Sequence, residues 1–187
     1  MRNLSRQKGV GLIEVLIAVL VLSVGLLGMV AMQITAKRNS FEAAQRSIAT
    51  GLSRDILERV RSNPGEVATY VAQLGGGSIS TAPASCNTGT CTPNALAQRD
   101  LYEWEQLLDG AAEKIIIDGN EFNAGGLVDP RACITNNAGV VTVAIVWKGV
   151  AEMDNPTASN CGETSGLYGT GNKQRRLMVM TTYVSDI

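Results

Sequence analysis

The sequence predicts an α+β fold in which one long N-terminal helix packs on a C-terminal antiparallel sheet. Three observations support this prediction: a helical pattern that continues from residue 10 to residue 61, a β-branched apolar run at 140–147, and a second such run at 176–184. A helix followed by antiparallel strands is the order typical of α+β domains. The chain has 187 residues, which is enough for one domain with a core plus appendages.

The first predicted element is an apolar helix. Glu14 is the only charged residue between Lys8 and Lys37, and the run Val10–Met32 is otherwise compatible with lipid. Its 23 residues would extend roughly 35 Å as a helix, enough to cross a bilayer core of about 30 Å. A cleaved secretory signal fits less well, because its apolar region is shorter and ends in an A-x-A-like site.

The nine residues before this helix are basic. They carry a net charge of +3, contributed by Arg2, Arg6 and Lys8. By the positive-inside rule the N-terminus stays in the cytoplasm, and everything after Lys37 lies outside it.

The helical pattern continues beyond the apolar run as an amphipathic helix. Apolar residues recur at steps of three or four, and the stripe consists of Phe41, Ala44, Ile48, Leu52, Ile56 and Val60. Pro64, between Asn63 and Gly65, ends the helix near Arg61.

The remaining elements are shorter. We expect a helical turn within 66–74, a flexible loop at 75–85, and a helix that begins with Thr92 as cap and Pro93 in the first position and ends at Gly110. The buried stripe of that helix is Ala97, Leu101, Trp104 and Leu108. We also expect a short strand at 114–118, a central strand at 140–147 that pairs with 132–135 as a hairpin, a glycine-rich loop at 151–173, and a last strand at 176–184.

Four cysteines follow the apolar run, in the part that this topology exports. In an oxidising compartment an even number of cysteines predicts disulfides. Short loop closure favours Cys86 with Cys91, which leaves Cys133 with Cys161. The rival is a zinc site, but the spacings C-x4-C and C-x27-C are not paired C-x-x-C knuckles. We therefore expect no metal.

Composition excludes several classes of function. The net charge of −1 and the aromatic content of 4% argue against a nucleic-acid binder, which needs a positive field or stacking platforms. Histidine is absent, and this excludes Ser/His/Asp and Cys/His nucleophiles. No convergent acid/base pair can be read from the spacing, so a membrane-anchored periplasmic enzyme is a remote alternative. We expect no enzyme activity and no cofactor.

The segment Lys8–Leu16, KGVGLIEVL, resembles the processing site of type IV prepilins and pseudopilins. It has a short basic leader ending in Gly9, followed by an apolar helix whose fifth mature residue is Glu14. The resemblance implies cleavage after Gly9 by the prepilin peptidase, N-methylation of Val10, and extraction of the helix from the membrane into a filament. Val10 and Gly11 differ from the phenylalanine and threonine common at these positions.

Glu14 is the predicted assembly residue. A carboxylate inside lipid costs on the order of 3 kcal/mol at the helix centre and less near an end. Its expected use is to neutralise the new α-amine of a neighbouring subunit, and the alternative is a side chain that snorkels to the headgroups. Small residues form a face that lets helix backbones approach closely, and its members are Gly11, Ala18, Gly25 and Gly28.

A second resemblance lies further along the chain. The small cysteine loop 86–91, which precedes a helix carrying Asp100 and Trp104, is similar to the PilV group of minor pilins. Arg175 and Arg176, before the last strand, add to this likeness. We expect Trp104 to belong to the core and the two arginines to be solvated.

The resemblances imply a minor pilin, an interaction subunit that supports assembly or priming of a type IV pilus and hence adhesion or twitching motility. The alternative is a minor pseudopilin of type II secretion. The expected partners are the prepilin peptidase, other minor and major pilins, the inner-membrane assembly platform and a tip adhesin. The expected regions are a leader at 1–9, a membrane helix at 10–33, an amphipathic helix at 34–62 and a periplasmic head at 63–187.

Overall fold

The computed structural model describes residues 11–86, 89–111 and 113–185. Two compact units are present, Met1–Phe41 and Glu42–Ile187. The described part of the first unit is the N-terminal part of helix α1, which runs over Leu12–Ser62 as one element of 51 residues. The predicted continuous helix is therefore present, although Val10 lies outside the described residues.

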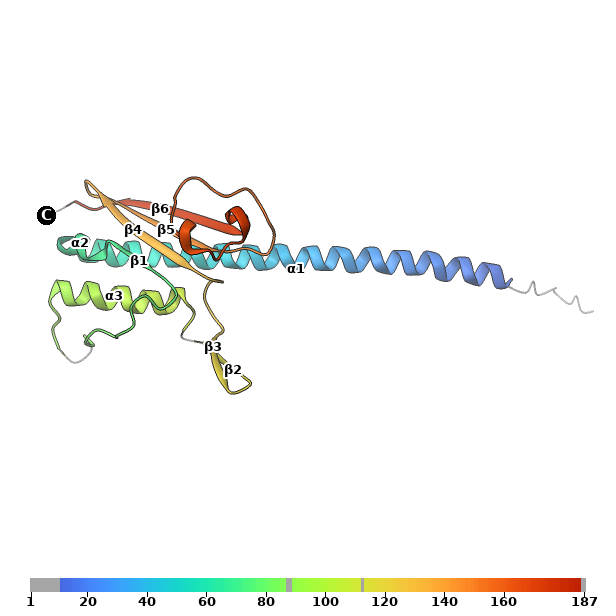
Figure 1. The fold of residues 1–187 in the computed structure, drawn as a ribbon, viewed down its shortest axis with the longest axis horizontal. Helices are drawn as coiled ribbons and strands as arrows, with labels where there is room; N and C mark the ends of the chain where they lie inside the picture. Colours follow the sequence, from blue (N-terminus) through green and yellow to red (C-terminus); the bar gives the residue numbers. More distant parts are fainter. Residues whose placement is uncertain (1–10, 87–88, 112, 186–187) are drawn as a thin grey trace, which may run out of the picture. The chain divides into compact units, whose positions relative to one another are not determined.

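The second unit contains the rest of α1 and all other elements (Figure 1). The helical elements are η1 (Pro64–Glu66), α2 (Val67–Tyr70), α3 (Pro93–Leu108), η2 (Glu163–Ser165) and η3 (Thr170–Asn172). The strands are β1 (Ala72–Leu74), β2 (Lys114–Ile117), β3 (Asn120–Asn123), β4 (Arg131–Asn137), β5 (Val140–Lys148) and β6 (Arg175–Tyr183). The α+β fold class is confirmed.

Two antiparallel sheets form. The larger has the order β1-β4-β5-β6, and the smaller is the hairpin β2-β3. β5 lies inside the larger sheet, as its β-branched sequence predicted, and Val143 pairs with both Ile134 and Met180. β1 corrects the expectation of a helical turn through residue 74. It consists of three residues that pair with Ala132–Ile134, so its strand conformation depends on a partner far along the chain.

One hydrophobic core joins the sheet to the helices of this unit. Figure 1 shows the second part of α1 between α3 and the strands β4 to β6. The core contains buried side chains from α1, α3, β4 and β5, including Ile56, Trp104 and Ile145, and the partly buried Met178 and Met180 of β6 pack against it. The indole N–H of Trp104 donates to the carbonyl oxygen of Leu52 at 2.9 Å. Trp104 is thus a core residue, as predicted, and also a hydrogen-bonded link between two helices.

The buried face of α1 differs in part from the predicted stripe. Leu52, Ile56 and Val60 are buried, but Phe41 and Ile48 are exposed, and Ala44 is exposed as well. Steps of four residues advance by about 40° around a helix, so the predicted stripe drifts off one face. The buried face begins instead at Gln45, whose amide bonds the backbone of Gly126 and Val128.

The end of α1 is tied to the last strand. Arg61 Nε donates to Thr182 Oγ1 at 2.8 Å. The two residues are 121 positions apart in sequence, so this hydrogen bond connects the first and the last elements of the second unit.

Candidate functional site

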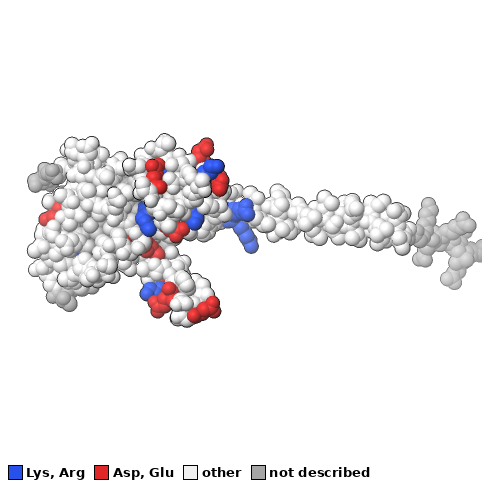
Figure 2. Space-filling view, in the orientation of Figure 1, with Lys and Arg blue, Asp and Glu red and all other residues white. Residues whose placement is uncertain are grey.

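The first unit presents an uncovered apolar helix. The large apolar side chains from Leu12 to Ile34 are between 48% and 80% exposed, and Figure 2 shows uncharged atoms along this stretch. Among the described residues α1 is the one helix long and apolar enough to cross a membrane, with an 18-residue window of mean hydropathy 2.8. Such a surface is stable only in lipid or against other apolar surfaces.

Glu14 lies in the first turn of this helix. One turn further on, the small side chain of Ala18 leaves a notch bordered by Val15, Val19 and Leu22. A Cβ added at Gly25 or Gly28 would meet nothing within 4 Å, so the predicted small-residue face is open. The predicted cleavage and methylation positions, Gly9 and Val10, lie outside the described residues.

Two disulfides stabilise the second unit. The bonds are Cys86–Cys91 and Cys133–Cys161, 5 and 28 residues apart in sequence, and none of the four cysteines is free. The longer bond ties the loop after β5 to the middle of β4. Within the described residues no group of three His, Cys, Asp or Glu side chains could hold a metal ion.

Helix α3 begins as its sequence predicted. The Thr92 hydroxyl accepts from the N–H of Ala95 at 3.2 Å, and Pro93 occupies the first turn. Sequence reasoning did not identify the buried polar contacts of this helix. Asp100 accepts from Arg59 Nη1 at 2.8 Å and from the Tyr70 hydroxyl at 2.6 Å. Burial, together with this hydrogen bond to Asp100, raises the pKa of Tyr70.

Glu105 anchors the loop after β1. Its carboxylate is fully buried and accepts from the N–H groups of Gly75, Ser78 and Ile79, each at 2.7 Å, and from the Ser78 hydroxyl. Burial alone would raise the pKa of this carboxyl, but the four hydrogen bonds outweigh it and lower the pKa. The segment expected to be flexible is therefore fixed at its beginning.

Arg175 and Arg176 were expected to be solvated, and this expectation is wrong. Arg175 is 1% exposed, and its guanidinium binds the backbone oxygens of Cys161, Pro156 and Ser159. It therefore fixes the loop that carries Cys161, and burial lowers its pKa. No local pattern revealed these partners, because they lie 14 to 19 residues earlier in the chain.

Arg176 binds helix α1. Its Nε and Nη2 donate to the two carboxylate oxygens of Glu42, each at 3.2 Å, and Nη2 also donates to the carbonyl oxygen of Ala151 at 2.8 Å. A Cβ at Gly149 would lie 2.4 Å from the Arg176 Cζ atom, so the close approach of backbone and guanidinium requires glycine there. Arg175 and Arg176 therefore connect the start of β6 to the loop after β5 and to helix α1.

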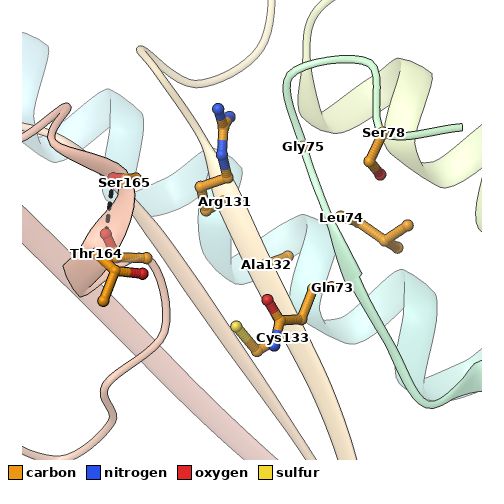
Figure 3. A pocket seen from close by; sticks show the side chains of 10 residues that line it. Gln73, Leu74, Gly75, Ser78, Arg131, Ala132, Cys133, Thr164 and Ser165 are labelled. Atoms are coloured by element: carbon orange, nitrogen blue, oxygen red, sulfur yellow. Dashed lines mark hydrogen bonds between the residues drawn. The ribbon is translucent and has the colours of Figure 1, made fainter. Parts of the chain in front are cut away.

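A polar pocket opens on the outer face of the sheet. It encloses about 300 Å³ between β1, β4 and the segment 162–165, and Figure 3 shows Gln73, Arg131 and Thr164 around it. Among its described lining residues Arg131 is the one that ionises. The pocket therefore lacks the two titratable groups that general acid–base catalysis uses.

Two protein families match the chain. Residues 4–30 match the prokaryotic N-terminal methylation motif, and residues 31–102 match the family described as Type IV pilin Tt1218. Over residues 4–102 the chain is therefore similar to type IV pilins, and both matches support a relation to the type IV pilin superfamily. No match was found among curated proteins or among solved structures.

The two matches cover successive parts of the chain. The methylation motif covers residues before α1 and the apolar start of α1, and the pilin match extends through the rest of α1 and into α3. Pilins are structural subunits rather than enzymes, and the family implies processing by prepilin peptidase and assembly with other pilins. The matches do not extend to the four-stranded sheet beyond β1.

Proposed function

We propose that this chain is a minor pilin that is incorporated into a type IV pilus and supports its assembly or priming, and hence adhesion or twitching motility. The observation that carries the proposal is the uncovered apolar stretch Leu12–Ile34 of α1, in a chain that also has a folded, disulfide-bonded second unit. The proposed PilV-like character rests on the cysteine loop before α3 and on Asp100 and Trp104 within that helix.

The proposed life cycle gives the apolar helix two successive environments. In the inner membrane, residues 1–9 lie in the cytoplasm, residues 10–33 cross the lipid, and residues 34–187 lie in the periplasm. In the filament, helices of neighbouring subunits replace the lipid. The small-residue face formed by Gly11, Ala18, Gly25 and Gly28, which is open at Gly25 and Gly28, supports close packing of those helices.

Glu14 would make the packing of the apolar helices in the filament specific. Cleavage after Gly9 would create an α-amine on Val10, and the Glu14 carboxylate of the neighbouring subunit would pair with it. Removing one partner of such a pair in a low-dielectric environment costs several kcal/mol, whereas membrane insertion does not need the charge.

Maturation provides the first test. The mature chain should have 187 − 9 = 178 residues, begin at Val10 and carry one additional methyl group in an intact-mass measurement of the membrane fraction. Replacing Gly9 with a bulky residue should leave the precursor uncleaved. A mature N-terminus beyond residue 30 would contradict the proposal.

Incorporation into filaments provides the second test. Glu14→Ala should be inserted and cleaved normally but be poorly recovered with sheared pili, and Glu14→Asp, which keeps the charge with a shorter reach, should be intermediate. Wild-type recovery of Glu14→Ala would reject the pairing. If deleting the gene abolishes protein secretion and leaves pili intact, the chain is a type II pseudopilin instead.

A further inference from the structure

The hairpin β2-β3 has no core of its own. Its strands pair only with each other, joined by the two-residue turn Asp118–Gly119, in which both residues have positive φ. Figure 1 shows the hairpin pointing away from the larger sheet. Its base is held by the Ala124 N–H, which donates to the Glu113 carbonyl oxygen at 2.6 Å. A two-stranded hairpin alone is only marginally stable in water, so a covering surface would stabilise it.

The hairpin has one apolar face. Ile115 pairs directly with Phe122, and Ile117 lies two residues along the same strand, so these three side chains point to the same side. Ile115 is 46% exposed, Phe122 is 50% exposed and Ile117 is 51% exposed. We call these three residues the hairpin apolar face.

The opposite side of the hairpin is different. It carries Lys114 and Glu121, whose charged groups pair at 2.9 Å, together with Ile116. Glu113 and Asp118 flank the hairpin and have no ion-pair partner among the described residues. Figure 2 shows this gathering of charged atoms on the hairpin. A surface that fits the hairpin must therefore be apolar with basic side chains at its border.

Helix α1 presents such a surface in the first unit. Ile34, Lys37, Arg38 and Phe41 follow the spacing i, i+3, i+4, i+7 and lie on one side of the helix. Ile34 and Phe41 are exposed, and neither cation has an ion-pair partner within the described residues. We call these four residues the basic helix face.

We propose that the hairpin apolar face of one copy packs on the basic helix face of a second copy of this chain, with Glu113 and Asp118 close to Lys37 and Arg38. Charge complementarity supports this occupant, because two acidic groups without an ion pair among the described residues flank the hairpin, and two basic groups of the same kind lie on the basic helix face. The two faces are different surfaces, so every copy can use both at once. A contact of this heterologous kind continues from copy to copy and can build an open helical array.

This inference goes beyond the proposed function, which requires only packing of the apolar helices. The contact would add a connection outside the lipid-facing segment. It would be available to the chain in a pilus and in a secretion pseudopilus alike.

Photocross-linking of the full chain tests the contact. Two copies with different tags are produced in the membrane of a host that has no other pilin, with benzoylphenylalanine in place of Phe122. After illumination, we expect cross-linked species that contain both tags, with the cross-link mapped by mass spectrometry to residues 34–41 of the second copy.

Two isoleucines of the hairpin form a matched pair of variants. Ile117→Asp places a charge in the hairpin apolar face and should lower the cross-link yield about tenfold. Ile116→Asp makes the same change on the opposite side, at the most exposed large apolar residue of the hairpin, and should leave the yield unchanged. Both positions are exposed, and equal protease resistance of the two variants checks that the second unit remains folded.

Charge reversal provides an independent test of the proposed contact. The double variant Lys37→Glu/Arg38→Glu should lower the yield, and adding Glu113→Lys/Asp118→Lys should restore it. Equal losses for Ile116→Asp and Ile117→Asp would overturn the proposal. So would the absence of rescue, cross-links confined to a single chain, or cross-links that form only when other pilins are supplied.

Discussion

A substitution at Glu105 gives the most specific prediction about the free energy of unfolding of the second unit. Oε1 of its buried carboxylate accepts from the N–H groups of Gly75 and Ser78 and from the Ser78 hydroxyl, and Oε2 accepts from the N–H of Ile79. Glu105→Gln keeps the shape and removes the charge. The best orientation of the amide keeps its oxygen at the three donors and turns its NH₂ group toward the Ile79 N–H.

The magnitude follows from these contacts. One buried N–H loses its acceptor, which costs about 2 kcal/mol, and three charge-assisted hydrogen bonds become neutral, which costs about 1 kcal/mol each. Part of this loss is offset because the variant no longer buries a charge. We therefore expect Glu105→Gln to lower the free energy of unfolding by about 3 kcal/mol at pH 7.

The effect should depend on pH in one direction. The pKa of Glu105 is lower in the folded chain than its ordinary value of 4.5. The stabilisation by the ionised carboxylate is therefore complete above the unfolded-state pKa and is lost as the pH falls through the folded-state pKa. The difference between wild type and Glu105→Gln should be constant from neutral pH down to about pH 5 and should shrink at lower pH.

The assay is urea unfolding of the full chain in detergent micelles, followed by tryptophan fluorescence. Both tryptophans of the chain, Trp104 and Trp147, are buried in the second unit, so their emission reports on that unit. Glu103→Gln is the matched control: it lies on the same helix, its side chain is 44% exposed, and it pairs with Arg99. The control should change stability by less than about 1 kcal/mol. Equal effects of the two variants at pH 7, or a Glu105→Gln effect that is undiminished at pH 3, would refute the reasoning.

Three further predictions concern the same unit, two of them measured by urea unfolding and one by limited proteolysis. Tyr70→Phe removes the hydroxyl that donates to Asp100 and should cost about 2 kcal/mol, because the donor served a buried carboxylate; an unchanged urea midpoint would contradict this. Arg175→Lys cannot reproduce the fork that holds three backbone oxygens; it should speed limited proteolysis within residues 151–173 while leaving the α1 segment intact. Replacing Cys133 and Cys161 together with serine opens a loop of 28 residues and should cost about 3.5 kcal/mol in the loop-entropy estimate. The variant should lose less stability than wild type on addition of reducing agent, because only Cys86–Cys91 remains to be reduced.

Elements with strong local patterns were predictable from sequence. α1, α3 with its Thr92 cap, and the central strand β5 each depend on periodicity or capping residues within the element itself. β1 was not predictable, because its three residues become a strand only by pairing with β4. β3 was missed although the sequence contains its indicator: Asp118–Gly119 is a two-residue hairpin turn, typical of type I′ geometry.

The residues of the candidate site also differ in whether they could be predicted from the sequence. Glu14 and the apolar stretch can be identified from composition alone, because a lone carboxylate in a lipid-compatible run is conspicuous. The burial of Arg176 could not be identified in that way, because its partner Glu42 is 134 residues away in sequence. Charged residues usually remain solvated, so a buried pair can be recognised only after the fold has brought the partners together.

The bond between Arg61 and Thr182 has a consequence for the order of events during synthesis. The membrane-compatible part of α1 is complete before any of the sheet exists, whereas β6, which supplies Thr182, is the last strand to be made. Pairing across such sequence separations is slow compared with helix formation. The second unit must therefore finish folding after translation, when the apolar N-terminal helix has already been made. A chain truncated before β6 would keep that helix but would lack a closed sheet.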